Sequence, residues 1–335
     1  MKLARLRKAI SLVTVLLLLS VWSTGGNCKD ISKSNKPLFA ELNKIATGKT
    51  RIIEIPTYDG SNQVVHPDIL VKDNTFYLVI TPYPYSNHDY ENPSLFISQN
   101  GIEFHPPKGV TNPIMAKQDQ GHNDDPDILF DSKKQMFYLY YLETRRYSHQ
   151  HVVLLNSTDG VNWSQTNCIE YLFRKGDPFI VSPSVIKKDK DYRMFYVDIT
   201  KIPHKIRYIK SSDGKSWNSG KPYRIRSDYP FSFSPWHIDL FEHNDKYYML
   251  VNGYWGVLWH KQYLYLAVSD NLVDWHFRKE PIISPSKAFY NSAKIYRSTG
   301  LIHNNNMFIW FSFKTYAGSW HLGVKKISLK NLNLE

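Results

Sequence analysis

Two short segments of the chain combine histidine and aspartate directly ahead of an apolar run. His122 to Asp131 has the sequence HNDDPDILFD, Val64 to Asp73 has the sequence VVHPDILVKD, and both contain Pro-Asp-Ile-Leu. Carboxylates crowded in a partly shielded site shift each other's pKa, so that one can stay protonated while another is ionised. A pair of such groups can cleave a glycosidic bond: one protonates the leaving oxygen, and the other activates water or attacks carbon.

Both segments belong to a repeat that also carries a recurring turn. In four copies a serine is followed six positions later by an aromatic residue: Ser98–Phe104, Ser157–Trp163, Ser211–Trp217 and Ser269–Trp275. Three copies contain Asn-Gly or Asp-Gly, which are typical of tight type I′ hairpins because both central residues of that turn need positive φ. Asp68, Asp127 and Asp239 each lie 30 residues before the turn serine, and Ser184 lies 27 residues before its own.

Each turn follows an apolar strand, an aromatic-rich strand and an opening strand, and the unit is about 57 residues long. The 9 Trp, 23 Tyr and 17 Phe also favour strands over helices. Units of this kind are typical of propeller blades. The sequence therefore predicts an all-β, five-bladed β-propeller over residues 50–335. We expect Thr50–Pro56 to supply the outermost strand of the last blade. A β-sandwich is the alternative, but it does not need this period.

Alignment of the opening strands places polar residues at two equivalent positions. Residues i and i+2 of a strand share a face, and the opening strand of each blade lines the channel, so both sets are expected to point inward. The first set is His66, Asp125, Ser182 and His237, and the second is Asp68, Asp127, Ser184 and Asp239. Arg297 is the expected member from the fifth unit, whose register is open by one or two residues.

A purely structural interpretation applies to any one of these residues. An aspartate at the start of a strand can hydrogen-bond the backbone, and a proline can fix the direction of the chain by holding its predecessor extended. Two histidines and four aspartates aligned in one ring favour a functional interpretation over the structural one.

The five-unit pattern, the DPDILFD segment and the S-x-D-G-x-x-W turns resemble the five-bladed propeller glycoside hydrolases, the broad group around families 43, 32 and 117. The resemblance covers about 280 residues. If the chain worked as family 43 does, the resemblance would imply three carboxyl groups. An Asp before Pro in blade one would be the base, an Asp before Pro in blade two would tune pKa and orientation, and a Glu in blade three would be the acid. Asp125 matches the second role. His66 stands at the position of the base and Ser182 near that of the acid, so the chain departs from that mechanism.

Other residues are candidates for the missing roles. Glu91, in the loop segment NHDYENPSLFIS, could be the proton donor or could cap a turn, since loops often carry function. Trp236 could stack on a sugar face or pack between blades. Two histidines with an aspartate can bind a divalent ion, although neutral histidines hydrogen-bonded to a ring aspartate or a sugar are the favoured interpretation. On this interpretation no cofactor is required, and a divalent cation bound in the central channel is the alternative.

These observations predict a glycoside hydrolase-like enzyme that acts on a polysaccharide or oligosaccharide. Its acid–base and orienting groups would be Asp68, Asp125, Asp127, Asp239 and Glu91. Its substrate-binding residues would be His66, His237, Arg297, Trp236, Ser182 and Ser184. The alternatives are a non-catalytic carbohydrate-binding propeller and a surface scaffold that binds another protein.

The N-terminus predicts export. Residues 1–26 combine a basic start, an apolar run from Ile10 to Trp22 and small residues, which is typical of a signal peptide; an uncleaved membrane anchor is the alternative, and residues 27–49 would be a linker. We expect a monomer that is secreted or held in the cell envelope. Cys28 and Cys168 could pair in an exported protein, and two cysteines are too few for a cysteine-based metal site.

The charge of the chain indicates its partners. The net charge is +12, and four of the basic residues lie in the predicted signal peptide, which leaves +8. A basic exported protein is attracted to anionic polymers such as acidic polysaccharide. Nucleic acid is not an expected partner, because no run of five or more basic residues occurs.

Overall fold

The computed structural model describes residues 37–116, 121–145, 149–171, 178–217, 222–230 and 232–332 of the chain. The predicted signal peptide and Cys28 lie outside these residues, so export and a Cys28–Cys168 pair stay predictions. Part of the predicted linker belongs to the packed unit, since the short helix α1 (Ala40–Asn43) buries Leu42 completely. No helix of the described residues is long and apolar enough to cross a membrane.

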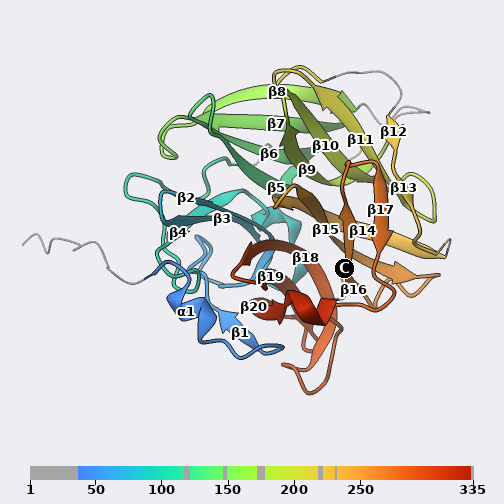
Figure 1. The fold of residues 1–335 in the computed structure, drawn as a ribbon. Helices are drawn as coiled ribbons and strands as arrows, with labels where there is room; N and C mark the ends of the chain where they lie inside the picture. The colour runs from blue at the N-terminus through green and yellow to red at the C-terminus, as the bar shows by residue number, and fades with distance from the viewer. Residues whose placement is uncertain are drawn as a thin grey trace, which may run out of the picture. The chain divides into compact units, whose positions relative to one another are not determined.

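The described strands form five sheets that follow one another around the molecule in chain order (Figure 1), and the predicted five-bladed β-propeller is confirmed. Blade one has β2 (Val64–Lys72), β3 (Thr75–Pro82) and β4 (Ser94–Ser98). Blade two has β5 (Gly121–Asp131), β6 (Met136–Arg145), β7 (His149–Ser157) and β8 (Ser164–Tyr171). Blade three has β9 (Ile180–Lys188), β10 (Asp191–Asp198), β11 (Lys205–Ser211) and β12 (Tyr223–Arg224).

The last two blades each recruit a strand from earlier in the chain. Blade four has β14 (Phe233–His243), β15 (Lys246–Trp255), β16 (Tyr263–Ser269), β17 (Asp274–Phe277) and the short β13 (Arg226–Ser227), which pairs with β17 in parallel. Blade five has β18 (Ser292–His303), β19 (Asn306–Thr315), β20 (Trp320–Ser328) and β1 (Thr50–Ile53). Three 3-10 turns complete the described elements: η1 (Pro84–Ser86), η2 (His88–Tyr90) and η3 (Leu329–Leu332).

The ring is closed by the N-terminal strand, as predicted. β1 pairs antiparallel with β20, with Thr50 opposite Lys325 and Ile53 opposite Leu322. In Figure 1 the blue β1 therefore lies beside the red β20, although the two strands are almost the whole chain apart. Because the ring is closed, blade five packs against blade one, and neither blade is left with an uncovered face.

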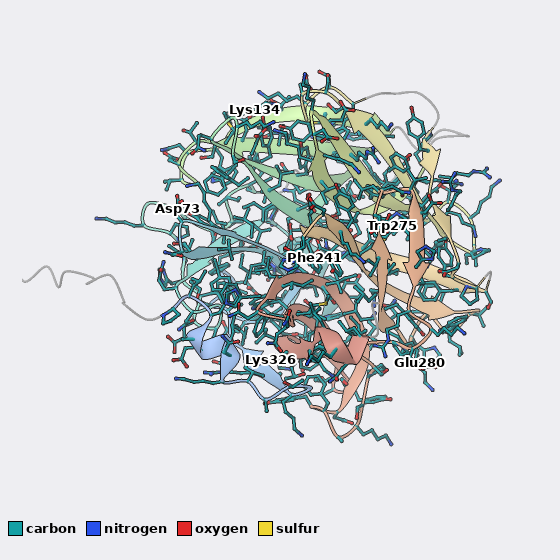
Figure 2. All side chains as sticks on the ribbon, in the orientation of Figure 1. Asp73, Lys134, Phe241, Trp275, Glu280 and Lys326 are labelled. Atoms are coloured by element: carbon teal, nitrogen blue, oxygen red, sulfur yellow. The ribbon has the colours of Figure 1, made fainter. Side chains whose placement is uncertain are left out.

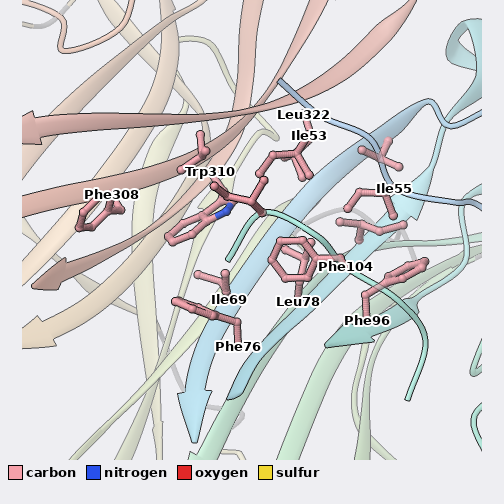
Figure 3. Close-up of a cluster of buried hydrophobic side chains, with 14 of the residues drawn as sticks. Ile53, Ile55, Ile69, Phe76, Leu78, Phe96, Phe104, Phe308, Trp310 and Leu322 are labelled. Carbon is pink, nitrogen blue, oxygen red and sulfur yellow. The ribbon is translucent and has the colours of Figure 1, made fainter. Parts of the chain in front are cut away.

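Apolar side chains fill the space between neighbouring blades. Figure 3 shows the cluster between blades five and one, where Phe308, Trp310 and Leu322 meet Phe76 and Phe96. The Trp310 indole nitrogen donates to the backbone oxygen of Gly101 in the blade-one turn, at 3.0 Å. The tryptophans that end the recurring turns also pack into these clusters: Trp217 and Trp275 are buried, and Trp163 is partly buried.

The recurring turn is held by side chains. Ser98 Oγ accepts hydrogen bonds from the amides of Asn100 and Gly101, and Asn100 Oδ1 accepts from the amides of Ile102 and Glu103. Of the Asn-Gly and Asp-Gly pairs, the glycine alone has a positive φ, +72° at Gly101. The type I′ prediction is therefore wrong, because the serine and Asx side chains stabilise a longer loop.

The innermost strand of every blade carries one extra residue relative to its partner at the same place, and β18 has a second register shift between Ser292 and Lys294. The register shifts lie between Val65 and Asp68, Asp124 and Asp127, Val181 and Ser184, Pro235 and His237, and Ile295 and Ser298. Such β-bulges interrupt the ladder and change the direction of side chains. These five bulges, called the bulge ring below, lie where both predicted polar sets lie.

In blades one to three the bulge contains a residue with positive φ just before a proline: His66 (+53°), Asp125 (+49°) and Ser182 (+56°). The expectation that proline would hold these residues extended is therefore wrong. A bulge leaves a backbone position unpaired, and proline fits there because it has no N–H to donate to the ladder. The X-Pro pairs thus mark the bulges.

Blades two and three are also tied by a buried carboxylate. Asp131, at the end of β5, accepts hydrogen bonds from Lys187 Nζ at 2.6 Å and from the Tyr192 hydroxyl, and its side chain is 1% exposed. Burial alone would raise the pKa of Asp131, but these hydrogen bonds lower it to about 2.

We predict that Asp131→Asn lowers the free energy of unfolding by about 2 kcal/mol at neutral pH. The pKa of Asp131 in the folded protein lies below its ordinary value of 3.8. The carboxylate therefore contributes fully above that value, and the contribution is lost as the pH falls through about 2. Urea denaturation at pH 7 and near pH 2 measures the difference, which should shrink in acid.

Asp73→Asn is the matched control, because Asp73 is 80% exposed and pairs with Lys72 at the surface; Figure 2 labels it at the edge of blade one. Its effect should be close to zero at both pH values. An Asp131→Asn loss that stayed constant down to pH 2 would contradict the assignment.

Candidate active site

The deeper of the two polar sets, together with Thr299 of blade five, joins four of the five pairs of neighbouring blades. Short side chains of one innermost strand accept the backbone amide of the following one, which is the structural role that an aspartate at this position can have. The ties are Ile128 N to Asp68 Oδ2 at 2.5 Å, Val185 N to Asp127 Oδ2 at 2.9 Å, Leu240 N to Ser184 Oγ at 3.0 Å, and Ile69 N to Thr299 Oγ1 at 3.2 Å. The predicted roles of Asp68, Asp127 and Ser184 in chemistry or substrate binding stay untested, and their contacts are structural.

Arg297 lies among these carboxylates and belongs to the ring, as expected. Its guanidinium is fully buried, 3.1 Å from Asp125 and 3.9 Å from Asp127, and it donates to the backbone oxygen of Pro183. Carboxylate oxygens of Asp68, Asp127 and Asp239 lie within 4.8 Å of one another. Burial and the Asp68 carboxylate raise the pKa of Asp127 and Asp239 well above the usual value, and Arg297 opposes this rise. One cation thus holds together a buried acidic layer.

The shallower set forms a second group, His66, Asp125 and His237, called the triad below. Asp125 Oδ1 lies 3.1 Å from His237 Nδ1 and 3.6 Å from His66 Nε2, and the two imidazole centroids are 5.1 Å apart. The three residues are at most 3% exposed. Ser182, predicted to bind substrate, instead donates its amide to Asp125 and exchanges hydrogen bonds with the backbone of Ile238.

The triad has the protonation states of a metal site. Burial lowers the pKa of His66 and of His237, which keeps both imidazoles neutral. Burial would raise the pKa of Asp125, but the two histidines and Arg297 lower it well below its usual value. Nε2 of both imidazoles has no hydrogen-bond partner among the described residues. Neutral imidazoles and a carboxylate are the ligands of divalent transition metals such as zinc.

The position of the ligand atoms also fits a cation. One ligand atom from each triad residue lies within 4.8 Å of the other two. His66 Nδ1 makes a 2.9 Å hydrogen bond with Thr81 Oγ1, which fixes the imidazole and leaves Nε2 toward Asp125. Hydrogen bonds of this kind orient the histidine ligands of metals. The residues of the triad therefore fit a divalent cation.

Glu91 lies beside the triad, just after η2, and is 2% exposed. Its Oε1 is 3.8 Å from His66 Nδ1, and its Oε2 is 2.6 Å from His88 Nδ1. Burial and then the Asp124 carboxylate raise the pKa of Glu91 well above its usual value. A raised pKa favours the protonated carboxyl group, which is the form that donates a proton. The structure thus brings the predicted proton donor to the triad.

His88 and His122 form the rim above Glu91, with ring centroids 4.9 Å apart. His122 Nε2 lies 3.1 Å from Asp124 Oδ2; burial alone would lower the pKa of His122, but that carboxylate raises it. Sequence reasoning assigned no role to either histidine. His122 begins the acidic segment, so its position was a usable signal, whereas His88 is placed by the conformation of a loop.

Aromatic side chains form one wall of the site. The Tyr296 ring is 4.3 Å from that of His237 and 4.9 Å from that of Trp320. Trp236, a predicted sugar platform, is half-buried and donates its indole N–H to the Tyr296 hydroxyl at 3.3 Å. Tyr296 and Trp320 were not predicted. The only sequence signal for Tyr296 was its place next to Arg297.

Fold and site together define a five-bladed propeller with a buried histidine–aspartate group near its axis. No protein-family model matches the chain. In sequence it is 24% identical, over an alignment 371 positions long, to the A type blood N-acetyl-alpha-D-galactosamine deacetylase of Flavonifractor plautii. The match covers 91% of this chain and 46% of that protein, so the chain spans about half the length of its relative.

Solved structures confirm the predicted resemblance to five-bladed glycoside hydrolases at the level of the fold. A crystal structure of an N-acetylgalactosamine deacetylase from F. plautii, in complex with blood group B trisaccharide, has a TM-score of 0.75 and 20% identity, covering 85% of this chain and 97% of that one. A thermostable family-43 glycoside hydrolase has a TM-score of 0.60 and 15% identity, with 85% and 91% covered. A Bacillus subtilis arabinanase has a TM-score of 0.57 and 14% identity, with 81% and 97% covered.

We predict that Arg297→Gln lowers the free energy of unfolding by about 3–5 kcal/mol, because it removes the cation from a buried acidic layer. The loss should be smaller at pH 5 than at pH 7. Carboxyl groups whose pKa is already raised take up protons at pH 5, and a protonated group no longer needs the cation. Urea denaturation followed by tryptophan fluorescence measures both values.

Arg226→Gln provides the matched control, since Arg226 is 73% exposed and pairs with Asp274 on the surface. Its cost should be at most about 1 kcal/mol. Equal losses for the two variants would show that Arg297 does not hold the layer together.

Proposed function

We propose that this protein is a hydrolase of carbohydrate, and that it removes the acetyl group of an N-acetylated sugar with the help of a divalent cation. The triad carries the proposal: two neutral imidazoles and an ionised carboxylate converge in a buried site, with Glu91 beside them. The comparisons support the carbohydrate-active class predicted from the sequence, and the relative matched over most of the chain is a deacetylase.

The reaction is the hydrolysis of an amide, in which water and the N-acetyl group give acetate and a free amine. A divalent cation held by the triad would polarise the amide carbonyl and make a water molecule more acidic. Glu91 lies beside the triad, 3.8 Å from His66 Nδ1, and a carboxyl group with a raised pKa suits the role of taking a proton from that water and returning it to the leaving nitrogen.

Tyr296 is placed to orient the acetyl group. Burial raises the pKa of its hydroxyl well above 10, so it stays protonated. The hydroxyl oxygen accepts a hydrogen bond from Trp236, which leaves its own hydrogen free to donate to a carbonyl oxygen. His88 and His122 close the rim over Glu91 and hold it by a 2.6 Å contact from His88.

The second candidate function is hydrolysis of a glycosidic bond, as first predicted. Asp125 and Glu91 are two buried carboxyl groups with opposite pKa shifts, which is the pattern of an acid–base pair. Ser182 remains near the position where the resemblance places the acid. Deacetylation fits better, because the carboxylate with the lowered pKa is shared between two histidines and Arg297.

The product distinguishes the two functions. We predict that the protein, supplied with Zn²⁺, releases acetate and an equal amount of free amine from N-acetylgalactosamine oligosaccharides, with no new reducing ends. His237→Ala should lower the rate by at least about a hundredfold, because it removes a triad residue. Enzymatic acetate assay and an amine-reactive label measure the two products.

His276→Ala is the control, because His276 is 82% exposed on blade four. Its rate should equal that of the unaltered protein. New reducing ends without acetate would favour the glycosidase, and full activity of His237→Ala would exclude a role for the triad.

A further inference from the structure

Blade five carries two lysines directly opposite each other at the wall of the site. Lys294 on β18 pairs with Lys314 on β19, and Lys314 pairs in turn with Trp320 on β20. Like charges at directly opposite positions of a sheet destabilise it. The arrangement therefore needs a compensating contact.

The contacts of the two lysines are aromatic and neutral. Lys294 Nζ lies 5.1 Å from the ring centroid of Tyr296 and 5.2 Å from that of Trp320. Lys314 Nζ lies 5.4 Å from the Trp320 ring and donates to Ser86 Oγ at 2.8 Å. Neither ammonium group has a carboxylate partner among the described residues.

Among the described residues, no carboxylate balances the charge of the pair. Burial, and then the positive charge of Lys314, lower the pKa of Lys294 to about 8. Because the Lys314 ammonium group lowers the pKa of Lys294, the two positive charges repel each other in surroundings that are shielded from water. An anion between or above them would remove that repulsion.

The pair adjoins both the triad and an open hollow. Tyr296, whose ring centroid lies 5.1 Å from Lys294 Nζ, also contacts the rings of His237 and His66. Ser86, which Lys314 contacts, also lines a hollow of about 640 Å³ between the blade-one loop and Asp59 and Ser61, which precede β2. A group held by the lysines would therefore lie one aromatic ring away from the triad, with room beside it for a sugar chain.

We propose that Lys294, Lys314 and Ser86 form a subsite for an anionic substituent of the substrate, a sulfate ester or a carboxylate on a sugar next to the one that reacts. The inference rests on the proposed function for the position of the reacting sugar, whereas anion binding itself is independent of the reaction. The substrate class is then an acidic N-acetylated polysaccharide, which agrees with the positive net charge of the chain.

Affinity electrophoresis tests the subsite without requiring turnover. The protein is run through gels that contain chondroitin sulfate, hyaluronan, or chondroitin that has been desulfated and carboxyl-reduced. We expect retardation by at least one of the two anionic polymers and none by the neutral one. Preference for chondroitin sulfate would assign the substituent as sulfate, and equal retardation by hyaluronan would assign it as carboxylate.

The double variant Lys294→Gln/Lys314→Gln should bind the anionic polymer about tenfold more weakly, since each lysine contributes a charge-assisted contact. Lys294→Arg/Lys314→Arg should retain most of the affinity. Lys188→Gln/Lys210→Gln is the matched control, because these lysines also lie 5.0 Å from tyrosine rings but in blade three. It loses the same net charge and should bind as the unaltered protein does.

The proposal is overturned if the first double variant binds as tightly as the unaltered protein, if the control loses as much, or if neither anionic polymer binds. The proposed function fails separately. His237→Ala should still bind the anionic polymer, so loss of acetate release without loss of retardation reports on the triad alone.

Discussion

A bulge in the innermost strand of each blade is the constraint on which the site depends. A regular strand sends alternate side chains to opposite faces, and both faces of these strands are packed against neighbouring blades. The bulge ring interrupts this alternation at one level of the propeller. It takes residues such as His66 and Asp125 out of the regular ladder, and their side chains gather near those of Asp127 and Arg297. Five copies of one local irregularity thus produce a single polar centre.

The two polar layers depend on each other electrostatically. Arg297 contacts Asp125 of the triad and Asp127 of the deeper layer, so one guanidinium serves both. It helps to keep Asp125 ionised while the deeper aspartates have raised pKa values. An ionised Asp125 between two neutral histidines is what a cation requires. The deeper layer, which also ties the blades together, therefore sets the chemistry of the shallower one.

The sequence was sufficient for the fold because the repeat fixes it. Strand order, blade number and closure by Thr50–Pro56 follow from a period that recurs five times, and apolar packing between blades obeys the same pattern. The residues that point toward the axis, including Arg297, could also be predicted from the repeat, since equivalent positions in a closed ring must meet. The conformations at His66 and Asp125 did not follow: proline was taken to enforce an extended predecessor, although proline inside a central strand is itself a signal of a bulge.

Several residues of the site could not be predicted from the repeat. His88 lies in a loop that no other blade copies, and its place depends on η1 and η2; Glu91 follows in the same loop and was predicted only as a candidate. Lys294 and Lys314 are unremarkable in sequence and become a pair only through strand register. Likewise, the interpretation of Ser182 as a substrate-binding residue could not foresee its hydrogen bonds with the backbone of blade four.

The metal content of the protein tests the central claim most directly. The protein and its His237→Ala variant are incubated with Zn²⁺, dialysed, and analysed by inductively coupled plasma mass spectrometry. The bound ion is then located by anomalous diffraction at the zinc edge. The account predicts one ion per chain, within bonding distance of His66, Asp125 and His237, and its loss from the variant. Retention of no ion, or of an ion at another place in both proteins, would contradict it.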